Sequence, residues 1–302
     1  MALSHAEREF RLAEGAFPFE SRFVEAGGAR LHYIDEGEGP VLLMLHGNPS
    51  WSYLYRDLVL SLRGRFRCVV PDLAGFGLSR PPEGFLFLPR DHAKLVAGLI
   101  EARDLRDVTL IAHDWGGPIG LAAARATGRV SRLCLGNTWA WSVSGDLHFE
   151  WFSKLLGGAL GGWLAERHAV FVNFLLPSSM RRRKLSAEEL AAFRAPFDGR
   201  QARRAMQIFP RAITGEGDWL RDLESYVAGF RGPAHFVWPD KDIAFRAKEL
   251  QRWRRLLPQA GVTPLSNCGH FLWLEAPDEA AAAVAAFMGA AGAATPAPPR
   301  VG

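Results

Sequence analysis

The sequence predicts an α/β protein, with a mostly parallel central sheet flanked by helices. Short apolar runs bounded by turn residues alternate along the chain with segments of helical periodicity. This alternation is typical of a parallel sheet that is covered on both faces. The 302 residues are 48% hydrophobic, so the chain also has enough apolar material for a large core.

The predicted sheet begins with a hairpin. Residues 22–26 and 30–35 alternate in polarity on either side of Gly27 and Gly28, so we expect them to pair antiparallel at one edge. Short buried strands follow, and we expect them at residues 41–45, 67–70, 108–112, 133–135, 234–238 and 262–265. Helices fit between the strands, and we expect them at residues 53–62, 90–102, 118–126, 244–257 and 278–288.

One interval breaks the alternation. From about residue 140 to about residue 230 there is no strand signal, only Trp, Phe, Leu, Arg and Ala in helical patterns. A helical insertion at the carboxyl ends of the strands would roof a pocket and exclude water from it; a separate helical domain is the alternative. We therefore divide the chain into a first core part (1–139), a helical cap (140–230) and a second core part (231–292). Gly, Ala and Pro dominate after Met288 and predict disorder, with 293–302 as a disordered tail.

Composition narrows the choice of partners. The formal net charge is +4, and the basic residues are scattered apart from the run at 181–184. We interpret this run as a solvated helix start, because no interleaved aromatic residues suggest a nucleic-acid contact. Cys68, Cys134 and Cys268 lack metal-ligand spacing, which favours reduced packing residues. Residues 1–10 are polar and no apolar run approaches membrane-spanning length, so we expect a cytoplasmic protein with no nucleic-acid or membrane partner, no metal and no cofactor.

Residues 108–118 carry the strongest chemical signal. They predict a strand, a sharp turn and the start of a helix, with Asp114 at the apex. Ala112 and Gly116 flank Asp114 as the small residues that such a turn needs. The first N–H groups of the helix, including that of Trp115, would point toward negative charge that develops beside Asp114.

An aspartate at this apex replaces the usual serine and changes the expected chemistry. A carboxylate is a reasonable nucleophile toward an sp³ carbon that bears a leaving group, such as a halide or a strained epoxide oxygen. We therefore interpret Asp114 as a covalent nucleophile; the alternative is an aspartate that only caps the helix.

Two later segments supply the partners of a nucleophile. His270 follows the strand expected at 262–265, and Asp242 follows the strand expected at 234–238. His270 can accept a proton from water, and a carboxylate behind it fixes its tautomer. We choose Asp242 as that carboxylate and treat Asp240 as a turn residue, although Asp240 stays an alternative. A histidine that only packs or caps is the other interpretation of His270.

Asn48 follows the strand expected at 41–45 and lies at the same edge of the sheet. Its backbone N–H can complete an oxyanion hole with that of Trp115. Its side-chain amide and the Trp115 indole N–H are neutral donors suited to a departing halide. The alternative is that Asn48 only supports the turn.

These segments together resemble one known family. His-Gly-Asn-Pro-Ser-Trp-Ser-Tyr-Leu-Tyr-Arg at 46–56, Pro-Asp-Leu-Ala-Gly-Phe-Gly-Leu-Ser at 71–79 and His-Asp-Trp-Gly-Gly at 113–117 are similar to haloalkane dehalogenases, and the similarity spans nearly the whole chain. The resemblance implies an α/β-hydrolase fold, Asp114 as nucleophile, His270 as base, and Asn48 with Trp115 as the halide-binding pair.

The catalytic acid differs between subfamilies of this family. Some members place a Glu just after the strand that follows the nucleophile helix, whereas this chain reads Leu-Gly-Asn-Thr-Trp at 135–139. The chain therefore resembles the subfamily in which an Asp after the later strand, here Asp242, is the acid. Asn137 stands about where the alternative Glu would be, and a supporting hydrogen bond from Asn137 to the His270–Asp242 pair is left open.

The expected reaction joins Asp114 to the alkyl group of a small apolar haloalkane, releases a halide ion, and then hydrolyses the ester with water activated by His270.

An epoxide hydrolase would need cap tyrosines, and only Tyr226 falls in the insertion; a binding-only receptor on the same fold is the third interpretation. Candidates for the pocket roof, of which several must simply be core, are Trp139, Trp141, Trp151, Phe152, Trp163, Phe171, Phe174 and Leu175.

Overall fold

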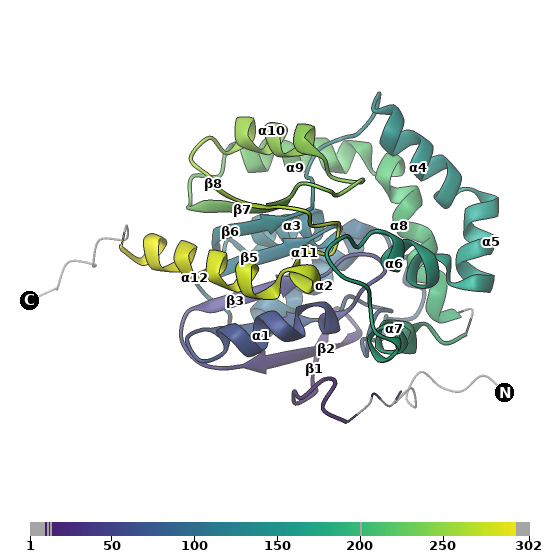
Figure 1. The fold of residues 1–302 in the computed structure, drawn as a ribbon, viewed down its shortest axis with the longest axis horizontal. Coiled ribbons are helices and arrows are strands. Elements are labelled where there is room, and N and C mark those ends of the chain that lie inside the picture. The colour runs from purple at the N-terminus through teal and green to yellow at the C-terminus, as the bar shows by residue number, and fades with distance from the viewer. Residues whose placement is uncertain (1–9, 11, 13, 200, 294–302) are drawn as a thin grey trace, which may run out of the picture.

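An eight-stranded sheet organises the chain in the computed structural model, which describes residues 10, 12, 14–199 and 201–293 (Figure 1). The strand order is β1-β2-β4-β3-β5-β6-β7-β8. Only the pairs β1–β2 and β2–β4 are antiparallel; the other neighbours are parallel. The strands are β1 (Arg22–Ala26), β2 (Ala29–Glu36), β3 (Val41–Leu45), β4 (Arg67–Pro71), β5 (Val108–His113), β6 (Val130–Gly136), β7 (Ala234–Pro239) and β8 (Gly261–Leu265).

The hairpin and all six expected strands are confirmed, with shifts at their ends. The middle strands are buried on both faces, which explains why they read as unbroken apolar runs: every residue of β5 is buried. β6 begins three residues earlier than expected, because Val130 pairs with Val108 beside an irregularity in the ladder.

Helices cover both faces of the sheet. In Figure 1, α1 and α12 lie in front of the sheet, whereas α2 and α3 lie behind it. The helices of the core are α1 (Arg56–Leu62), α2 (Pro89–Ala102), α3 (Gly116–Thr127), α10 (Ala247–Leu256), α11 (Leu272–Glu275) and α12 (Pro277–Ala293).

Several helix boundaries differ from the sequence-based expectations. The helix expected at 53–62 begins as a 3₁₀ turn, η2 (Ser52–Tyr55), and α10 begins at Ala247 rather than at residue 244. The short helix α11 was not expected. We expected disorder directly after Met288, but α12 continues to Ala293, so this prediction is wrong for residues 289–293. Alanine, which is frequent here, favours continued helix. Residues 294–302 of the expected tail lie outside the described residues.

Between β6 and β7 the described residues form helices and loops but no strand. The elements are α4 (Leu147–Gly157), α5 (Ala159–His168), the π-helical η3 (Phe171–Leu175), α6 (Leu176–Ser178), α7 (Ala187–Arg194), η4 (Ala195–Phe197), η5 (Gln201–Arg203), α8 (Arg204–Gly215) and α9 (Gly217–Ala228). We expected the basic run at 181–184 to be a helix start, but it forms a loop before α7. Ser186 instead caps α7 through a capping box with Glu189.

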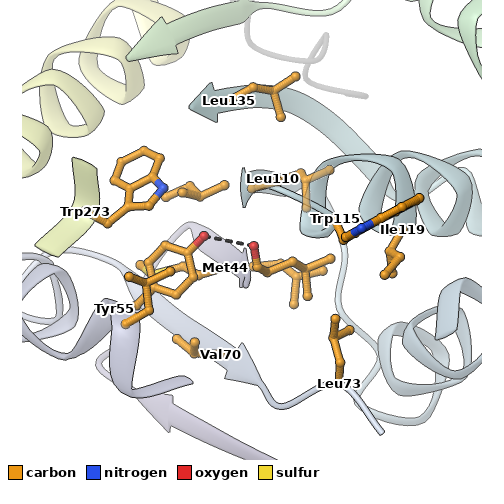
Figure 2. Packing of buried hydrophobic residues seen from close by; sticks show 14 of the residues in the cluster. Met44, Tyr55, Val70, Leu73, Leu110, Trp115, Ile119, Leu135 and Trp273 are labelled. Atoms are coloured by element: carbon orange, nitrogen blue, oxygen red, sulfur yellow. Dashed lines mark hydrogen bonds between the residues drawn. The ribbon is translucent and has the colours of Figure 1, made fainter. Parts of the chain in front are cut away.

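The core continues from the sheet to the turn at Asp114, where Ala112 and Trp115 both belong to it. Figure 2 shows Met44, Leu110 and Leu135 of neighbouring strands in this layer, with Trp115 on its α3 side. The Tyr55 hydroxyl donates a hydrogen bond of 2.9 Å to the backbone carbonyl of Leu45. Among the described residues, no helix combines the length and the hydropathy that crossing a bilayer requires.

Candidate active site

Asp114 lies at a strained turn between β5 and α3. Its φ is +51°, in the left-handed region that a residue with a side chain seldom adopts. Two hydrogen bonds with the segment after β6 hold the turn: the Asp114 N–H donates to Asn137 O (2.9 Å), and the Thr138 hydroxyl donates to Asp114 O (2.6 Å). The expected strand, sharp turn and helix are therefore present.

Close packing around this turn requires glycine at two positions. A Cβ on Gly47 would lie 2.2 Å from Asp114 Oδ1, and a Cβ on Gly116 would lie 2.1 Å from Leu45 O. Neither gap accommodates a methyl group, which explains the small residue two positions after Asp114.

Backbone donors surround the Asp114 carboxylate. The Asn48 N–H donates to Oδ1 at 2.7 Å, and the Trp115 N–H also stabilises the charged carboxylate. Burial nevertheless raises the pKa of Asp114, against the opposing effect of the His270 imidazole and these two donors. The carboxylate thus faces the two N–H groups that the sequence predicts as an oxyanion hole.

His270 and Asp242 form a buried pair after β8 and β7. His270 Nδ1 lies 2.8 Å from Asp242 Oδ2, and the other oxygen of Asp242 accepts the Ala244 N–H at 2.7 Å. Burial alone would lower the pKa of His270, but the carboxylates of Asp242 and Asp114 outweigh burial and raise this pKa.

Asp240 is not the partner of His270. Its side chain is 48% exposed, lies 3.6 Å from the Lys241 ammonium, and accepts the Cys268 N–H at 3.3 Å. These are the contacts of a turn residue, and they leave Asp242 as the carboxylate behind the histidine.

Asn137 supports the histidine in a different way from the one left open by the sequence. Its Nδ2 donates to the backbone carbonyls of Gly269 (3.1 Å) and His270 (2.7 Å), not to the side chains of the His270–Asp242 pair. The imidazole of His113 also lies on the His270 carbonyl, with Nε2 at 2.9 Å. Sequence reasoning missed His113, although it is the first residue of the His-Asp-Trp-Gly-Gly motif.

The side chains of Asn48 and Trp115 line the same cavity as Asp114 and His270. The Trp115 indole is stacked on Phe209 (5.4 Å between centroids) and edge-on to Trp139 (4.6 Å). Within the described residues, neither the indole Nε1 of Trp115 nor the side-chain amide of Asn48 makes a hydrogen bond to protein. Both donors are therefore available to a ligand in the cavity.

The cavity, of about 140 Å³, is lined by a few polar residues, among them Asp114 and His270, and by a larger number of apolar residues. Of the expected roof residues, Trp139, Phe152, Phe171 and Leu175 line it. Three others, Trp151, Trp163 and Phe174, are exposed instead, and Trp141 packs edge-on against Trp253. Helix α4 shows the reason: its inward face includes Phe149 and Ser153, whereas Trp151 lies on its outward face.

Comparison with known proteins identifies the family. Residues 40–277 match the family described as alpha/beta hydrolase fold. Haloalkane dehalogenase 2 of Mycobacterium tuberculosis is 38% identical over 272 residues, which cover 89% of this chain and 94% of the relative. A cis-3-alkyl-4-alkyloxetan-2-one decarboxylase of Shewanella oneidensis is 32% identical over 284 residues, covering 90% of this chain and 89% of the relative.

Structural comparison leads to the same family. The crystal structure of a haloalkane dehalogenase from Bradyrhizobium elkani has a TM-score of 0.83 at 25% identity, with 92% of this chain and all of that chain covered. The chain thus belongs to the haloalkane dehalogenases of the α/β-hydrolase superfamily, hydrolases that act on carbon–halogen bonds.

Proposed function

We propose that this enzyme hydrolyses small apolar haloalkanes through a covalent alkyl ester on Asp114. The observation that carries the proposal is the meeting, in one cavity, of the Asp114 carboxylate and the buried His270–Asp242 pair. A nucleophile and a base fixed by its own carboxylate are the groups that a two-step displacement and hydrolysis needs.

In the first step, Asp114 attacks the halogen-bearing carbon in line with the carbon–halogen bond. Because Oδ1 already accepts the Asn48 N–H, we assign Oδ2 as the attacking oxygen. The halide leaves with the bonding electron pair and binds the Asn48 amide and the Trp115 indole N–H. Neutral donors stabilise this anion without holding it as tightly as a cation would.

In the second step, water cleaves the ester. His270, oriented by Asp242, takes a proton from water, and the hydroxide attacks Cγ of Asp114. Negative charge develops on Oδ1, which accepts the Asn48 N–H, and the Trp115 N–H at the same carboxylate helps to stabilise this charge. Collapse of this intermediate restores the carboxylate and gives an alcohol, a halide ion and a proton.

Residues 140–230 would serve as the cap over this site. Their contribution to the cavity is mostly apolar, with His148, Ser178 and Ser179 as the polar residues. The apolar part, mainly Phe149, Phe152, Phe171, Leu175 and Ile213, suits an apolar substrate and excludes water from the first step. A cytoplasmic location is part of the same proposal, on the basis of three buried cysteines that are all free.

Halide release tests the proposal. We expect a panel of short bromo- and chloroalkanes to give halide and acid with the native enzyme, and none with Asp114→Asn. Turnover of epoxides without any halide release would move the reaction to epoxide hydrolysis, although no tyrosine is among the described residues that line the cavity. Failure to turn over either class would favour the binding-only receptor.

A second candidate is decarboxylation of a dialkyl oxetan-2-one, the reaction in the name of the Shewanella oneidensis relative. Asp114 would attack the sp³ ring carbon that is bonded to the ring oxygen. The ring would open there, and a carboxylate would take the place of halide as the leaving group. Loss of CO₂ would then form an alkene and release Asp114. The neutral donors of Asn48 and Trp115 have no protein acceptor among the described residues. They favour this candidate because they can donate to a carboxylate as well as to a halide. Since this route consumes no water, a His270→Ala variant would retain it while losing haloalkane turnover.

A further inference from the structure

Glu275 of α11 joins the His270 loop to the insertion. Its side chain is buried, with the residue 6% exposed. One carboxylate oxygen accepts the Gly269 N–H at 2.9 Å, and the other accepts the N–H groups of Arg181 (2.5 Å) and Arg182 (2.8 Å). One buried carboxylate therefore connects the residue before the base to a loop of the insertion.

A second contact lies beside this carboxylate. The His270 N–H donates to Ser179 O at 3.1 Å. A Cβ on Gly269 would lie 2.1 Å from Ser179 O and 2.8 Å from Glu275 Oε1, so the two segments approach each other as closely as glycine allows. The insertion thus reaches the backbone of the base directly.

The other side of the His270 backbone is fixed by the core, where Asn137 and His113 both lie on its carbonyl oxygen. The peptide groups before and after the base are consequently held by different parts of the chain. Loss of the Glu275 contacts would leave the hydrogen bonds to the His270 carbonyl intact, but it would loosen the backbone before His270, where the insertion makes its contacts.

We propose that Glu275 is a positioning residue for hydrolysis of the alkyl-enzyme: by binding the N–H groups of Gly269, Arg181 and Arg182, it holds the His270 ring where it deprotonates water. This inference rests on the proposed two-step mechanism and adds the insertion to the control of its second step. Glu275 lines no part of the cavity, so it acts through His270 and not on the substrate.

The donor set explains why a carboxylate is required. Three N–H groups converge on two oxygens that both accept. A glutamine would present its NH₂ group to at least one of these donors, and an aspartate, one methylene shorter, would not span both loops. Hydrogen bonds to a charged acceptor are also roughly twice as strong as neutral ones.

Glu275 also contributes charge. The ionisable groups that face His270 are Asp242, Asp114, Glu275 and His113, and the first three raise its pKa. Replacement of Glu275 by glutamine removes one negative charge, whereas replacement by aspartate retains it. Glu275→Asp therefore loses position alone, whereas Glu275→Gln loses position and charge, and the difference between the two variants isolates the effect of charge.

The experiment is a rapid-quench single turnover with a short bromoalkane, which measures bromide release (alkylation) and alcohol formation (hydrolysis) separately. We expect Glu275→Gln and Glu275→Asp to slow hydrolysis by about ten- to a hundredfold, in line with the cost of displacing a catalytic group by about 1 Å. Alkylation should change less than about twofold, because no Asp114 contact involves Glu275. With Glu275→Gln alone, the acid limb of the hydrolysis rate should also move to lower pH, since removal of a negative charge lowers the pKa of His270.

Glu279→Gln is the matched control. Glu279 pairs with the side chain of the same Arg182 at the surface, so its substitution should leave both rate constants unchanged. A partly misfolded variant would lose the amplitude of both phases without changing their ratio. Native hydrolysis rates in both Glu275 variants, or equal slowing of the two steps, would overturn the proposal, whereas absence of a halide burst in the native enzyme would instead overturn the two-step mechanism.

Discussion

The proposed nucleophile, Asp114, and the proposed base, His270, are fixed in different ways. Asp114 is held within the core: its carboxylate accepts the N–H of Asn48, its own N–H donates to Asn137 O, and its carbonyl accepts the Thr138 hydroxyl. His270 is held partly by the core and partly by the insertion, directly through Ser179 O and indirectly through Glu275 of α11, which binds both the Gly269 N–H and the insertion. The difference teaches that the position of the group that acts in alkylation should depend on the core, whereas the position of the group that acts in hydrolysis should also depend on the insertion.

The largest separation of the two steps is expected from His270→Ala. The variant should release about one equivalent of halide per enzyme and then stop, because loss of the general base slows hydrolysis by roughly 10²- to 10⁴-fold. Mass spectrometry should detect the alkyl adduct on the peptide that contains Asp114. Equal loss of halide release and of alcohol formation would show that His270 acts in the first step as well.

The pair Asp242→Asn and Asp240→Asn tests which carboxylate orients the base. Asp242→Asn should slow hydrolysis by about 10²-fold or more, since an amide no longer holds the imidazole in the required tautomer. Asp240→Asn should leave steady-state turnover unchanged because, among the described residues, the polar partners of the Asp240 side chain are only Lys241 and the Cys268 N–H. The reverse ranking in a steady-state assay would exchange the two roles.

A smaller effect, confined to the first step, is expected from Trp115→Phe. This substitution removes the indole N–H but retains an aromatic ring against Phe209, so alkylation should slow by about ten- to a hundredfold. Hydrolysis should be unaffected, because the backbone N–H at this position remains. Trp141→Phe is the control, since Trp141 packs on Trp253 away from the cavity; rapid-quench rates that fall equally in both variants would argue against a halide-binding role.

The smallest expected effect is a difference in the pKa of His270 between the free enzyme and the alkyl-enzyme. The Asp114 carboxylate raises this pKa in the free enzyme, and ester formation removes its charge. The pKa should therefore fall when the ester forms, which keeps His270 neutral and able to accept a proton over a wider pH range. An NMR titration of His270 in the free enzyme, compared with the pH dependence of the hydrolysis phase, measures the difference; a higher pKa in the alkyl-enzyme would have the wrong sign.

Local sequence was sufficient to predict the core and the residues that meet in the cavity. Asp114, Asp242, His270 and Asn48 each follow a strand of one parallel sheet, so strand prediction alone places them at a common edge. The residues beside Asp114 likewise predict the tight turn, because Gly116 occupies a position that has no room for a side chain.

The contacts of the insertion could not be read in the same way. The run at 181–184 resembles an exposed helix start, but Arg181 and Arg182 donate backbone N–H groups to a glutamate 93 or 94 positions later. Backbone donors carry no signature of residue type, which is why Glu275 escaped sequence analysis. Trp151 and Trp163 show the converse error, in which residue type was misleading. A tryptophan suggests burial in the pocket roof, and only the orientation of α4 and α5 shows that these two are exposed.

The most direct test of the covalent mechanism is a single turnover of a bromoalkane in H₂¹⁸O with enzyme in excess. Attack by water at Cγ of Asp114 predicts an alcohol that contains no ¹⁸O and a peptide with one ¹⁸O incorporated at Asp114. An alcohol that is fully labelled in the first turnover, with an unlabelled Asp114, would mean that water attacks the substrate directly and would contradict the covalent mechanism.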